Sequence, residues 1–292
     1  MLQEVLEYLD PKPGEVIVDA TLGTAGHSEV ILEKIGSSGT LIAVDRDPES
    51  LEAARQRLGD RAGKVHFVRG NFSELDQLLK ELNIDKVDGV LFDLGISSFQ
   101  LENPERGFSF QAEGPLDMRL DRESYISAYD LVNNLNEDEI SNMLWTFGEE
   151  RWHNRIARRL VEERKEHPIA TTAQLSDIVI KAIPARFRHG RMHAATRTFQ
   201  AVRIAVNREL EVLETALRKA INLLSPGGRI CVIAFHSLED RIVKLNFRAA
   251  AQEGSLSILT PKPLVPAAEE AKRNPSSRSS KFRAAEKTGQ KP

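Results

Sequence analysis

The sequence predicts an α/β fold, in which a mostly parallel sheet carries an inserted helical domain. Two observations support this prediction. Up to Asp93, short apolar runs alternate with helix-sized segments, an order typical of strands and helices in a parallel sheet. From residue 105 to residue 195 the periodicity is helical and no convincing strand is found. We therefore expect residues 1–104 and 196–292 to form the core, and residues 105–195 to form a separate helical domain.

The core strands are predicted from short runs of apolar residues, which are typical of strands buried in a parallel sheet. The expected strands are 16–19, 41–45, 65–68, 87–92 and 229–235, with two closing strands near 257–260 and 281–286. Residues 262–280 are rich in proline, alanine, serine and charge. This composition predicts a mobile connection between the two closing strands.

Helices are predicted where apolar residues recur at helical spacing. Such spacing extends from about Arg197 to Leu224 and predicts one long core-facing helix, which Pro226-Gly227-Gly228 ends. A further helix is expected from about Leu238 to Ala251. In the inserted domain the expected helices are 126–131, 137–147 with Asn136 as its cap, 156–164 and 172–182.

The segment from Val16 to Asp45 has the order in which an α/β protein holds a nucleoside. A strand is followed by a loop of small residues, a helix and a second strand ending in Asp45, 19 residues after Gly26. Small residues let the backbone approach a ligand, and an acid at this spacing accepts hydrogen bonds from ribose hydroxyls. Only Gly23 and Gly26 of the dinucleotide fingerprint are present, which favours S-adenosylmethionine over NAD. A plain strand-to-helix turn is the alternative.

Polar side chains stand at the carboxyl ends of the predicted strands, where open α/β sheets bind ligands. They are residues 23–27, Asp45, Asn71-Phe72, Asp93 and His236-Ser237. Asp93 is a candidate for contact with the methionine part of the cofactor or with the group that is methylated. Phe72 is a candidate for stacking on adenine, with core packing as the alternative. For His27 the alternative is helix capping, and for His236 a buried structural role.

The net charge of −3 conceals a strong asymmetry along the chain. Residues 1–150 carry 13 basic and 30 acidic side chains, whereas residues 151–219 carry 15 and 7. A basic segment on an acidic chain favours a polyanionic partner. The run from Arg186 to His193 holds three arginines (186, 188 and 191), a phenylalanine and a glycine without an acid. This mixture predicts contact with a nucleic-acid backbone, and solvated helix faces are the alternative.

The sequence also predicts the cellular compartment of the protein. The single cysteine, Cys231, lies in an apolar run and predicts a core residue, so no disulfide within the chain is expected. No apolar run approaches the roughly 18 residues of a membrane span. The N-terminus lacks the basic start of a signal peptide. We expect a cytoplasmic protein that needs neither a membrane nor a metal.

Sequence blocks with a shared pattern run in order along nearly the whole chain. They are 19–23 (DATLG) with 26–28 (GHS), 45–48 (DRDP), 88–95 (DGVLFDLG), 106–110 (RGFSF), 114–119 (GPLDMR), 148–151 (GEER), 195–201 (ATRTFQA) and 235–244 (FHSLEDRIVK). In these blocks the chain resembles the bacterial 16S ribosomal RNA cytosine-N4 methyltransferases, the RsmH (MraW) family. The blocks around Arg106 and His236 are specific, because they are not generic to methyltransferases.

The resemblance implies a Rossmann-like class I methyltransferase sheet and S-adenosylmethionine as the cofactor. The substrate that it implies is the N4 amine of a P-site cytosine in 16S ribosomal RNA or the small ribosomal subunit. Ala25 stands where the family usually has glycine, which narrows the backbone angles available there. The implied cofactor contacts are Ala25, Gly26, His27, Asp45, Phe72, Asp93 and Gln100.

The chemistry of such a reaction points to hydrogen-bond acceptors. The cytosine amine is a poor nucleophile because its lone pair is delocalised into the ring, and an acceptor on its N–H bonds favours a nucleophilic geometry. Asp93 and His236 are therefore the candidate catalytic residues. The base is expected from a single-stranded or splayed nucleotide. Two other functions stay open: a methyltransferase acting on DNA, protein or a small molecule, and a non-catalytic RNA-binding assembly factor.

Overall fold

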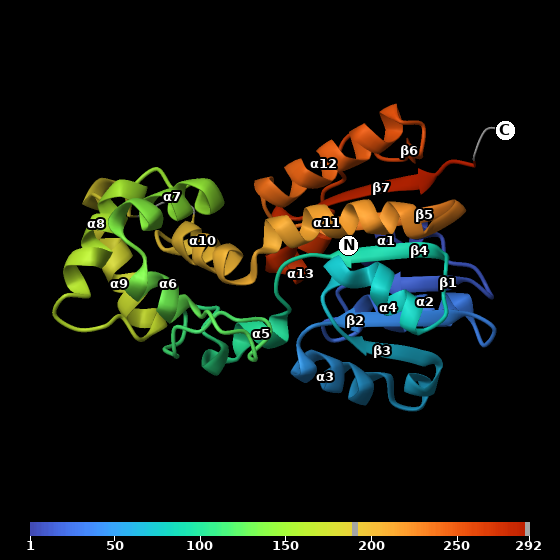
Figure 1. Ribbon diagram of the computed structural model, residues 1–292, viewed down its shortest axis with the longest axis horizontal. Coiled ribbons are helices and arrows are strands. Elements are labelled where there is room, and N and C mark those ends of the chain that lie inside the picture. The colour runs from blue at the N-terminus through green and yellow to red at the C-terminus, as the bar shows by residue number, and fades with distance from the viewer. Residues whose placement is uncertain (189–191, 290–292) are drawn as a thin grey trace. The chain divides into compact units, whose positions relative to one another are not determined.

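The computed structural model describes residues 1–188 and 192–289, and describes residues 62–64 by their backbone alone. The chain forms two compact units, one of residues 1–95 and 210–292 and one of residues 96–209 (Figure 1). The second unit is longer at both ends than the helical domain expected at 105–195. At its far end the reason is helix α10 (Thr196–Asn207), which packs Phe199, Ala201 and Val202 into the core of this unit.

The first unit is built on a seven-stranded sheet with the strand order β3-β2-β1-β4-β5-β7-β6. Strands β1 to β5 pair in parallel, and β7 pairs antiparallel with both β5 and β6. The predicted Rossmann-like α/β class is therefore confirmed. The strands are β1 (Val16–Asp19), β2 (Thr40–Asp45), β3 (Val65–Arg69), β4 (Val87–Asp93), β5 (Leu224–Ala234), β6 (Leu256–Ile258) and β7 (Lys281–Lys287).

Successive strand residues enter two separate cores, because side chains along a strand alternate between the faces of a sheet. Val90 packs in the core covered by α4, α11 and α12. Leu91 and Cys231 pack in the core covered by α1, α2 and α3, so Cys231 is buried as expected. The helices of this unit are α1 (Leu2–Leu9), α2 (Gly26–Ile35), α3 (Pro48–Leu58), α4 (Leu75–Glu81), α11 (Glu209–Leu223), α12 (Ser237–Gln252) and α13 (Ala268–Arg273).

The long helix expected over 197–224 is wrong, since the chain forms two helices there. Arg208 adopts a left-handed φ of 51° and ends α10. The side chain of Asn207 fixes this break: its Oδ1 accepts the N–H of Leu120 at 2.9 Å, and its Nδ2 donates to the carbonyl of Met118 at 2.8 Å. These partners are remote in sequence, so the apolar periodicity gives no sign of the break.

Two segments near the end of the chain also differ from expectation. Pro226-Gly227-Gly228 lies inside β5, beside a shift of the β4–β5 register between Val87 and Gly89. Proline and glycine are tolerated in strands at such irregularities. Residues 262–280, expected as a mobile connection, contain α13 and a 3-10 turn over Pro275–Ser279.

The second unit is helical in its described part, as predicted. Asn136 caps α7: its Oδ1 accepts the N–H of Glu139 at 2.9 Å, and the Glu139 carboxylate accepts the N–H of Asn136 at 2.8 Å. This reciprocal pair is a capping box, which satisfies two amides at the helix start. The helices are α5 (Ser98–Glu102), α6 (Ala128–Asn134), α7 (Glu137–Gly148), α8 (His153–Glu163), α9 (Thr172–Ala182) and α10.

A tight loop ahead of α6 depends on two glycines. A Cβ on Gly107, whose φ is +69°, would lie 2.2 Å from the carbonyl oxygen of Pro115. A Cβ on Gly114 would lie 1.9 Å from the carbonyl oxygen of Pro104. Gly114 is also held by Thr172, because its N–H donates to the Thr172 hydroxyl at 3.1 Å and its carbonyl accepts the Thr172 N–H at 3.0 Å. The loop therefore has no room for a side chain at either position.

Across residues 1–188 and 192–289, no helix has both the length and the apolar character that a membrane crossing requires.

Candidate functional site

The loop between β1 and α2 is hydrogen-bonded to the strands on both sides of β1. The N–H of Leu22 donates to the carbonyl of Val44 in β2 at 3.0 Å. On the other side, the hydroxyl of Thr21 accepts the N–H of Asp93 in β4 at 2.6 Å. The loop therefore brings the carboxyl ends of β2 and β4 around the N-terminus of α2.

Asp19 links this loop to the first turn of α2 through its buried carboxylate. It is 1% exposed, and its carboxylate accepts the hydroxyl of Ser28 at 2.7 Å and the N–H of Thr21 at 3.2 Å. Burial raises the pKa of the Asp19 carboxyl, against the hydrogen bond from Ser28, which lowers it. The sequence alone gives no role to Asp19 or Thr21. Their shared signal is a polar side chain at or just after the end of a strand, and both side chains hydrogen-bond to other parts of the protein.

Ala25 and Gly26 form the start of α2. Ala25 is fully buried and adopts the left-handed region, with φ of 63° and ψ of 24°. That region favours glycine, so the alanine carries backbone strain at this position. A Cβ on Gly26 would find its nearest atom 3.9 Å away, at Nη1 of Arg57. Contacts within the protein therefore do not demand glycine here, and the open space beside the backbone fits the close approach of a ligand.

Asp45 ends β2 with both carboxylate oxygens anchored by backbone amides. Oδ2 accepts the N–H of Gly23 at 3.0 Å, and Oδ1 accepts the N–H of Asp47 at 2.9 Å. Burial raises the pKa of the Asp45 carboxyl to about 6, although these two hydrogen bonds act to lower it. Each oxygen keeps a second lone pair, so the fixed carboxylate can accept two hydroxyl groups side by side, as a ribose diol presents them.

Asp93 ends β4 beside His27. Nδ1 of His27 lies 3.4 Å from Oδ2 of Asp93. Burial lowers the pKa of the His27 imidazole, but the hydrogen bond and the charge of Asp93 outweigh it, so this pKa lies above its usual value. Oδ1 of Asp93 is shielded from solvent and has no hydrogen-bond partner among the described residues. Buried acceptors are normally satisfied, so this oxygen is available to accept a hydrogen bond from a ligand.

Phe72 opens the 3-10 turn Phe72–Glu74 after β3. Its ring is half-buried and packs edge-on against Phe92, with 5.6 Å between the centroids. This contact supports the core-packing alternative. The part of the ring that stays exposed leaves stacking on adenine as a proposal.

Gln100 belongs to the other unit, in the short helix α5. Its side-chain oxygen accepts the N–H of Ser97 at 3.1 Å, and its N–H donates to the Ser97 hydroxyl at 3.2 Å. The residue is 4% exposed and forms a capping box with Ser97. Gln100 thus has a structural role within its own unit, and its contact with the cofactor stays a prediction.

His236 caps α12 directly after β5. Its Nδ1 accepts the N–H of Glu239 at 3.4 Å, which places the proton of a neutral imidazole on Nε2. Nε2 lies 3.3 Å from Oε1 of Glu239, and Oε2 of Glu239 accepts the N–H groups of Phe235 and His236. The capping contact of Nδ1 supports the buried structural alternative. Nε2 is buried and makes no hydrogen bond within the described residues, so a catalytic role for His236 stays a prediction.

The capping geometry predicts separate outcomes for two variants of His236. His236→Ala is expected to lower the free energy of unfolding by about 1 kcal/mol, the usual cost of losing an N-cap. His236→Asn keeps a capping acceptor, so its unfolding free energy is expected to match the wild type within about 0.5 kcal/mol. Denaturant titration measures both values. A methyl-transfer rate that falls in a fully stable His236→Asn protein would instead assign the imidazole to catalysis.

The basic run from Arg186 to His193 is described only in part, since His189, Gly190 and Arg191 lie outside the described residues. Arg188 donates to the carbonyls of Ile183 at 2.8 Å and Lys181 at 3.3 Å, and so satisfies the C-terminal end of α9. The guanidinium of Arg186 lies over the ring of Phe187, 4.8 Å from its centroid. The arginines of this run therefore differ in what they contact.

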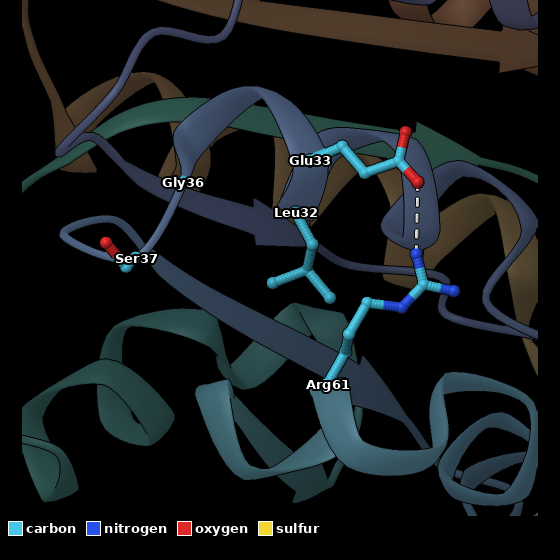
Figure 2. A pocket seen from close by; sticks show the side chains of 5 residues that line it. All are labelled: Leu32, Glu33, Gly36, Ser37 and Arg61. Carbon is cyan, nitrogen blue, oxygen red and sulfur yellow. Dashed lines mark hydrogen bonds and ion pairs between the residues drawn. The ribbon is translucent and has the colours of Figure 1, made fainter.

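A separate pocket of about 220 Å³ lies at the opposite end of α2 (Figure 2). Leu32, Glu33, Gly36, Ser37 and Arg61 line it. Arg61 pairs with Glu33 at 3.0 Å across it. Ala25, Gly26 and His27 stand at the N-terminus of α2, so this pocket lies apart from them.

Comparison with known proteins shows the family to which the chain belongs. Residues 1–288 match the model of the MraW methylase family. The ribosomal RNA small subunit methyltransferase H of Trichlorobacter lovleyi is 50% identical, over 99% of this chain and 97% of its own length. The proteins of the same name from Geobacter sulfurreducens and Brevibacillus brevis are 51% and 43% identical, each over 98% of this chain and over 97% and 96% of their own lengths. The chain therefore belongs to the MraW methylase family.

Proposed function

We propose that this methyltransferase transfers a methyl group from S-adenosylmethionine to the N4 amine of a P-site cytosine in 16S ribosomal RNA, in the cytoplasm. The relatives named above carry their activity in their names, and this chain matches them over almost its whole length. The observation that carries the proposal is the pair of Asp93 and His27. Oδ2 of Asp93 lies beside Nδ1 of His27, and Oδ1 of Asp93 is buried and lacks a hydrogen-bond partner within the described chain.

The residues around the N-terminus of α2 fit S-adenosylmethionine. Asp45 offers two fixed acceptors for the ribose, and the open space at Gly26 admits the nucleoside close to the backbone. Phe72 is the proposed side chain beside the adenine. No anion-binding glycine loop is needed, because this nucleoside carries no phosphate. When bound, it supplies an electrophilic methyl group attached to a positively charged sulfur.

Asp93 is the proposed acceptor for the cytosine amine. An N–H of the amine that donates to Oδ1 shifts electron density toward nitrogen and turns its lone pair toward the methyl group. As the new N–C bond forms, the bond between the methyl group and sulfur would break, and the amine must lose one proton, for which the carboxylate of Asp93 is the proposed acceptor. Nδ1 of His27 lies 3.4 Å from Oδ2 of Asp93, and the hydroxyl of Thr21 accepts the backbone N–H of Asp93. Alignment of the reacting groups can supply up to about 7 to 11 kcal/mol of barrier reduction.

Nucleoside mass spectrometry tests this proposal. Small ribosomal subunits from cells that lack the protein are incubated with the purified protein and isotope-labelled S-adenosylmethionine, and the 16S RNA is digested to nucleosides. We expect labelled N4-methylcytidine and no labelled product from duplex DNA or bulk protein. Label in DNA, protein or a small molecule would favour another acceptor. An absence of label everywhere, with normal RNA binding, would favour a non-catalytic assembly factor.

The raised pKa of Asp45 predicts a pH-dependent affinity for the cofactor. Above about pH 6 the carboxyl is ionised and both oxygens accept hydroxyl groups, whereas below this value it gains a proton and one acceptor is lost. Calorimetric titration between about pH 5 and about pH 8 is expected to show the dissociation constant rising as the pH falls, by up to about tenfold per pH unit.

Asp45→Asn provides the control for this dependence. The amide keeps the shape of the side chain but has no charge to lose, so its affinity is expected to be about 10- to 150-fold weaker at high pH and independent of pH. A pH dependence that persists in Asp45→Asn would assign the titration to His27. A wild-type affinity that stays constant across this range would place the ribose elsewhere.

A further inference from the structure

Two aromatic rings and two arginines form a continuous surface in the second unit, which we call the aromatic–arginine ladder. Arg186 lies over the ring of Phe187, with 4.8 Å from its guanidinium carbon to the centroid. Phe187 packs against Trp152 at 5.2 Å between centroids and an angle of 40°. Arg155 lies over the ring of Trp152 at 5.9 Å. The order is therefore cation, ring, ring, cation. Arg186 and Phe187 lie on the 3-10 turn Ala185–Phe187, Trp152 directly precedes α8, and Arg155 lies on α8.

The ladder is exposed to solvent on one side and packs against the helical core through Trp152 on the other. Phe187 is 42% exposed, and Arg155 and Arg186 are exposed. The ring of Trp152 is half-buried against the helical core, and the backbone N–H of Trp152 donates to the Glu150 carboxylate at 2.8 Å. Phe187 lies between Arg186 and the ring of Trp152, so the exposed aromatic surface extends over two neighbouring rings, each with an arginine over it.

The charges of the ladder are not neutralised by the described residues. No described carboxylate lies within ion-pair distance of Arg155 or Arg186. Arg158, one turn further along the same helix, pairs with Glu137 at 3.5 Å, and Arg159 pairs with Glu163 at 2.5 Å. Arg158 and Arg159 thus behave as solvated helix-face residues, as one alternative predicted. The ladder itself keeps two positive charges beside two aromatic rings.

We propose that the aromatic–arginine ladder binds single-stranded RNA by stacking nucleobases on Phe187 and Trp152 while Arg155 and Arg186 pair with the phosphates. This inference rests on the proposed function, since it names where the RNA substrate is held. A base that replaces the Arg186 guanidinium on the ring of Phe187 releases that cation to the neighbouring phosphate. Stacking with paired backbone charges is the general mode of single-strand recognition, and it tolerates different sequences because every base has a π-face.

The role is consistent with the chemistry proposed for the enzyme. A cytosine amine within a helix stack is not accessible to a methyl donor, so the target nucleotide must be splayed from its neighbours. Unstacking costs a few kcal/mol per base, and a protein surface that restacks the flanking bases offsets this cost. The ladder offers such a surface in the unit that carries the basic segment.

Variants of Phe187 test the stacking. We expect Phe187→Leu to weaken binding of a short single-stranded cytidine or adenosine oligonucleotide by about 5- to 150-fold, the range of one base stacked on an aromatic ring. Phe187→Tyr keeps the ring and is expected to bind within about twofold of the wild type. Because leucine preserves most of the apolar contact with Trp152, loss of folding does not explain this difference. Annealing the same RNA to its complement is expected to abolish the effect of Phe187→Leu.

Arg155 and Arg158 form a matched pair for the charge contribution. Both are exposed and lie on α8, but only Arg158 has an acidic partner in the described structure. Arg155→Gln is expected to reduce the slope of log affinity against log salt by about 0.7, the value for one phosphate on a single strand. Arg158→Gln is expected to leave the slope unchanged. Equal slopes in both variants would remove Arg155 from the interface.

Fluorescence places the base on the ladder directly. The chain has two tryptophans, so in Trp145→Phe all indole emission comes from Trp152. Single-stranded RNA is expected to quench this emission along the same curve as binding measured by anisotropy. Full binding without quenching, together with wild-type affinity in Phe187→Leu, would overturn the proposal. If the wild type methylates 16S RNA in that case, the proposed function stands without the ladder. If RNA quenches the emission of Trp152 and no RNA is methylated, the RNA-binding role of the ladder is supported and the proposed methyl transfer is contradicted.

Discussion

Asparagine at position 93 is expected to lower the single-turnover rate of methyl transfer by about 30- to 150-fold at saturating cofactor and RNA. This corresponds to about 2 to 3 kcal/mol, the difference between an ionised and a neutral acceptor on the cytosine amine. The amide keeps the shape of the side chain and its place beside His27. It loses the negative charge that draws the amine proton. Rapid quenching of a reaction started with excess enzyme measures this rate without product release.

Asp88→Asn is the matched control, because Asp88 lies in the same strand and accepts the N–H of Val16 at 2.9 Å, away from the site. Its single-turnover rate is expected to equal that of the wild type. If Asp93 instead holds the charged end of the cofactor, Asp93→Asn will bind the cofactor weakly and recover the full rate at saturation. That recovery would contradict the acceptor role.

Alanine at position 114 is expected to destabilise the second unit by about 3 kcal/mol or more, near the upper end of overpacking costs. Its Cβ would overlap the carbonyl oxygen of Pro104, and hydrogen bonds to Thr172 hold the backbone of Gly114 in place. Neither side of the contact is a flexible side chain that can turn away. The melting temperature is expected to fall by roughly 10 °C.

Gly289→Ala provides the comparison for this loss of stability. A Cβ at Gly289 has no atom within 4 Å, so its melting temperature is expected to be unchanged. Calorimetry follows both variants and separates the transitions if the two units melt independently. A Gly114→Ala protein with a wild-type melting temperature would mean that the loop between Pro104 and Thr172 rearranges at little cost.

The sequence predicted the sheet well because buried parallel strands are nearly continuous apolar runs. Strand β1 has the expected bounds, and β2, β3, β4 and β7 differ from expectation by one residue at an end. Helix α9 has the expected bounds, and α7 ends one residue later than expected. Such elements are set by local periodicity. The break at Arg208 is set by hydrogen bonds from Asn207 to residues almost ninety positions earlier, which no local pattern contains.

The candidate site was predictable where chemistry and position coincide. Asp45 and Asp93 are acids at strand ends, and both lie beside the loop that carries Gly26. The roles of Thr21 and Asp19 were not predictable, since both depend on which side chain meets which amide after folding. His236 shows what the sequence leaves open. A histidine after a strand resembles a catalytic group in sequence, and the structure gives its Nδ1 a capping contact with the N–H of Glu239 while its Nε2 makes no hydrogen bond within the described residues.

The insertion of the second unit between β4 and β5 delays the completion of the sheet during protein synthesis. Synthesis of strand β4 is complete once residue 93 has been added, whereas its partner β5 begins only at Leu224. In the finished protein Val90, Leu91 and Phe92 are fully buried. Until β5 emerges, these residues form an unpaired apolar edge of the kind that recruits other chains. Closing so long a loop costs little extra free energy, because the cost grows only with the logarithm of its length. This topology therefore exposes the nascent chain, rather than the finished protein, to aggregation. Translation that stops before β5 leaves a fragment prone to aggregate.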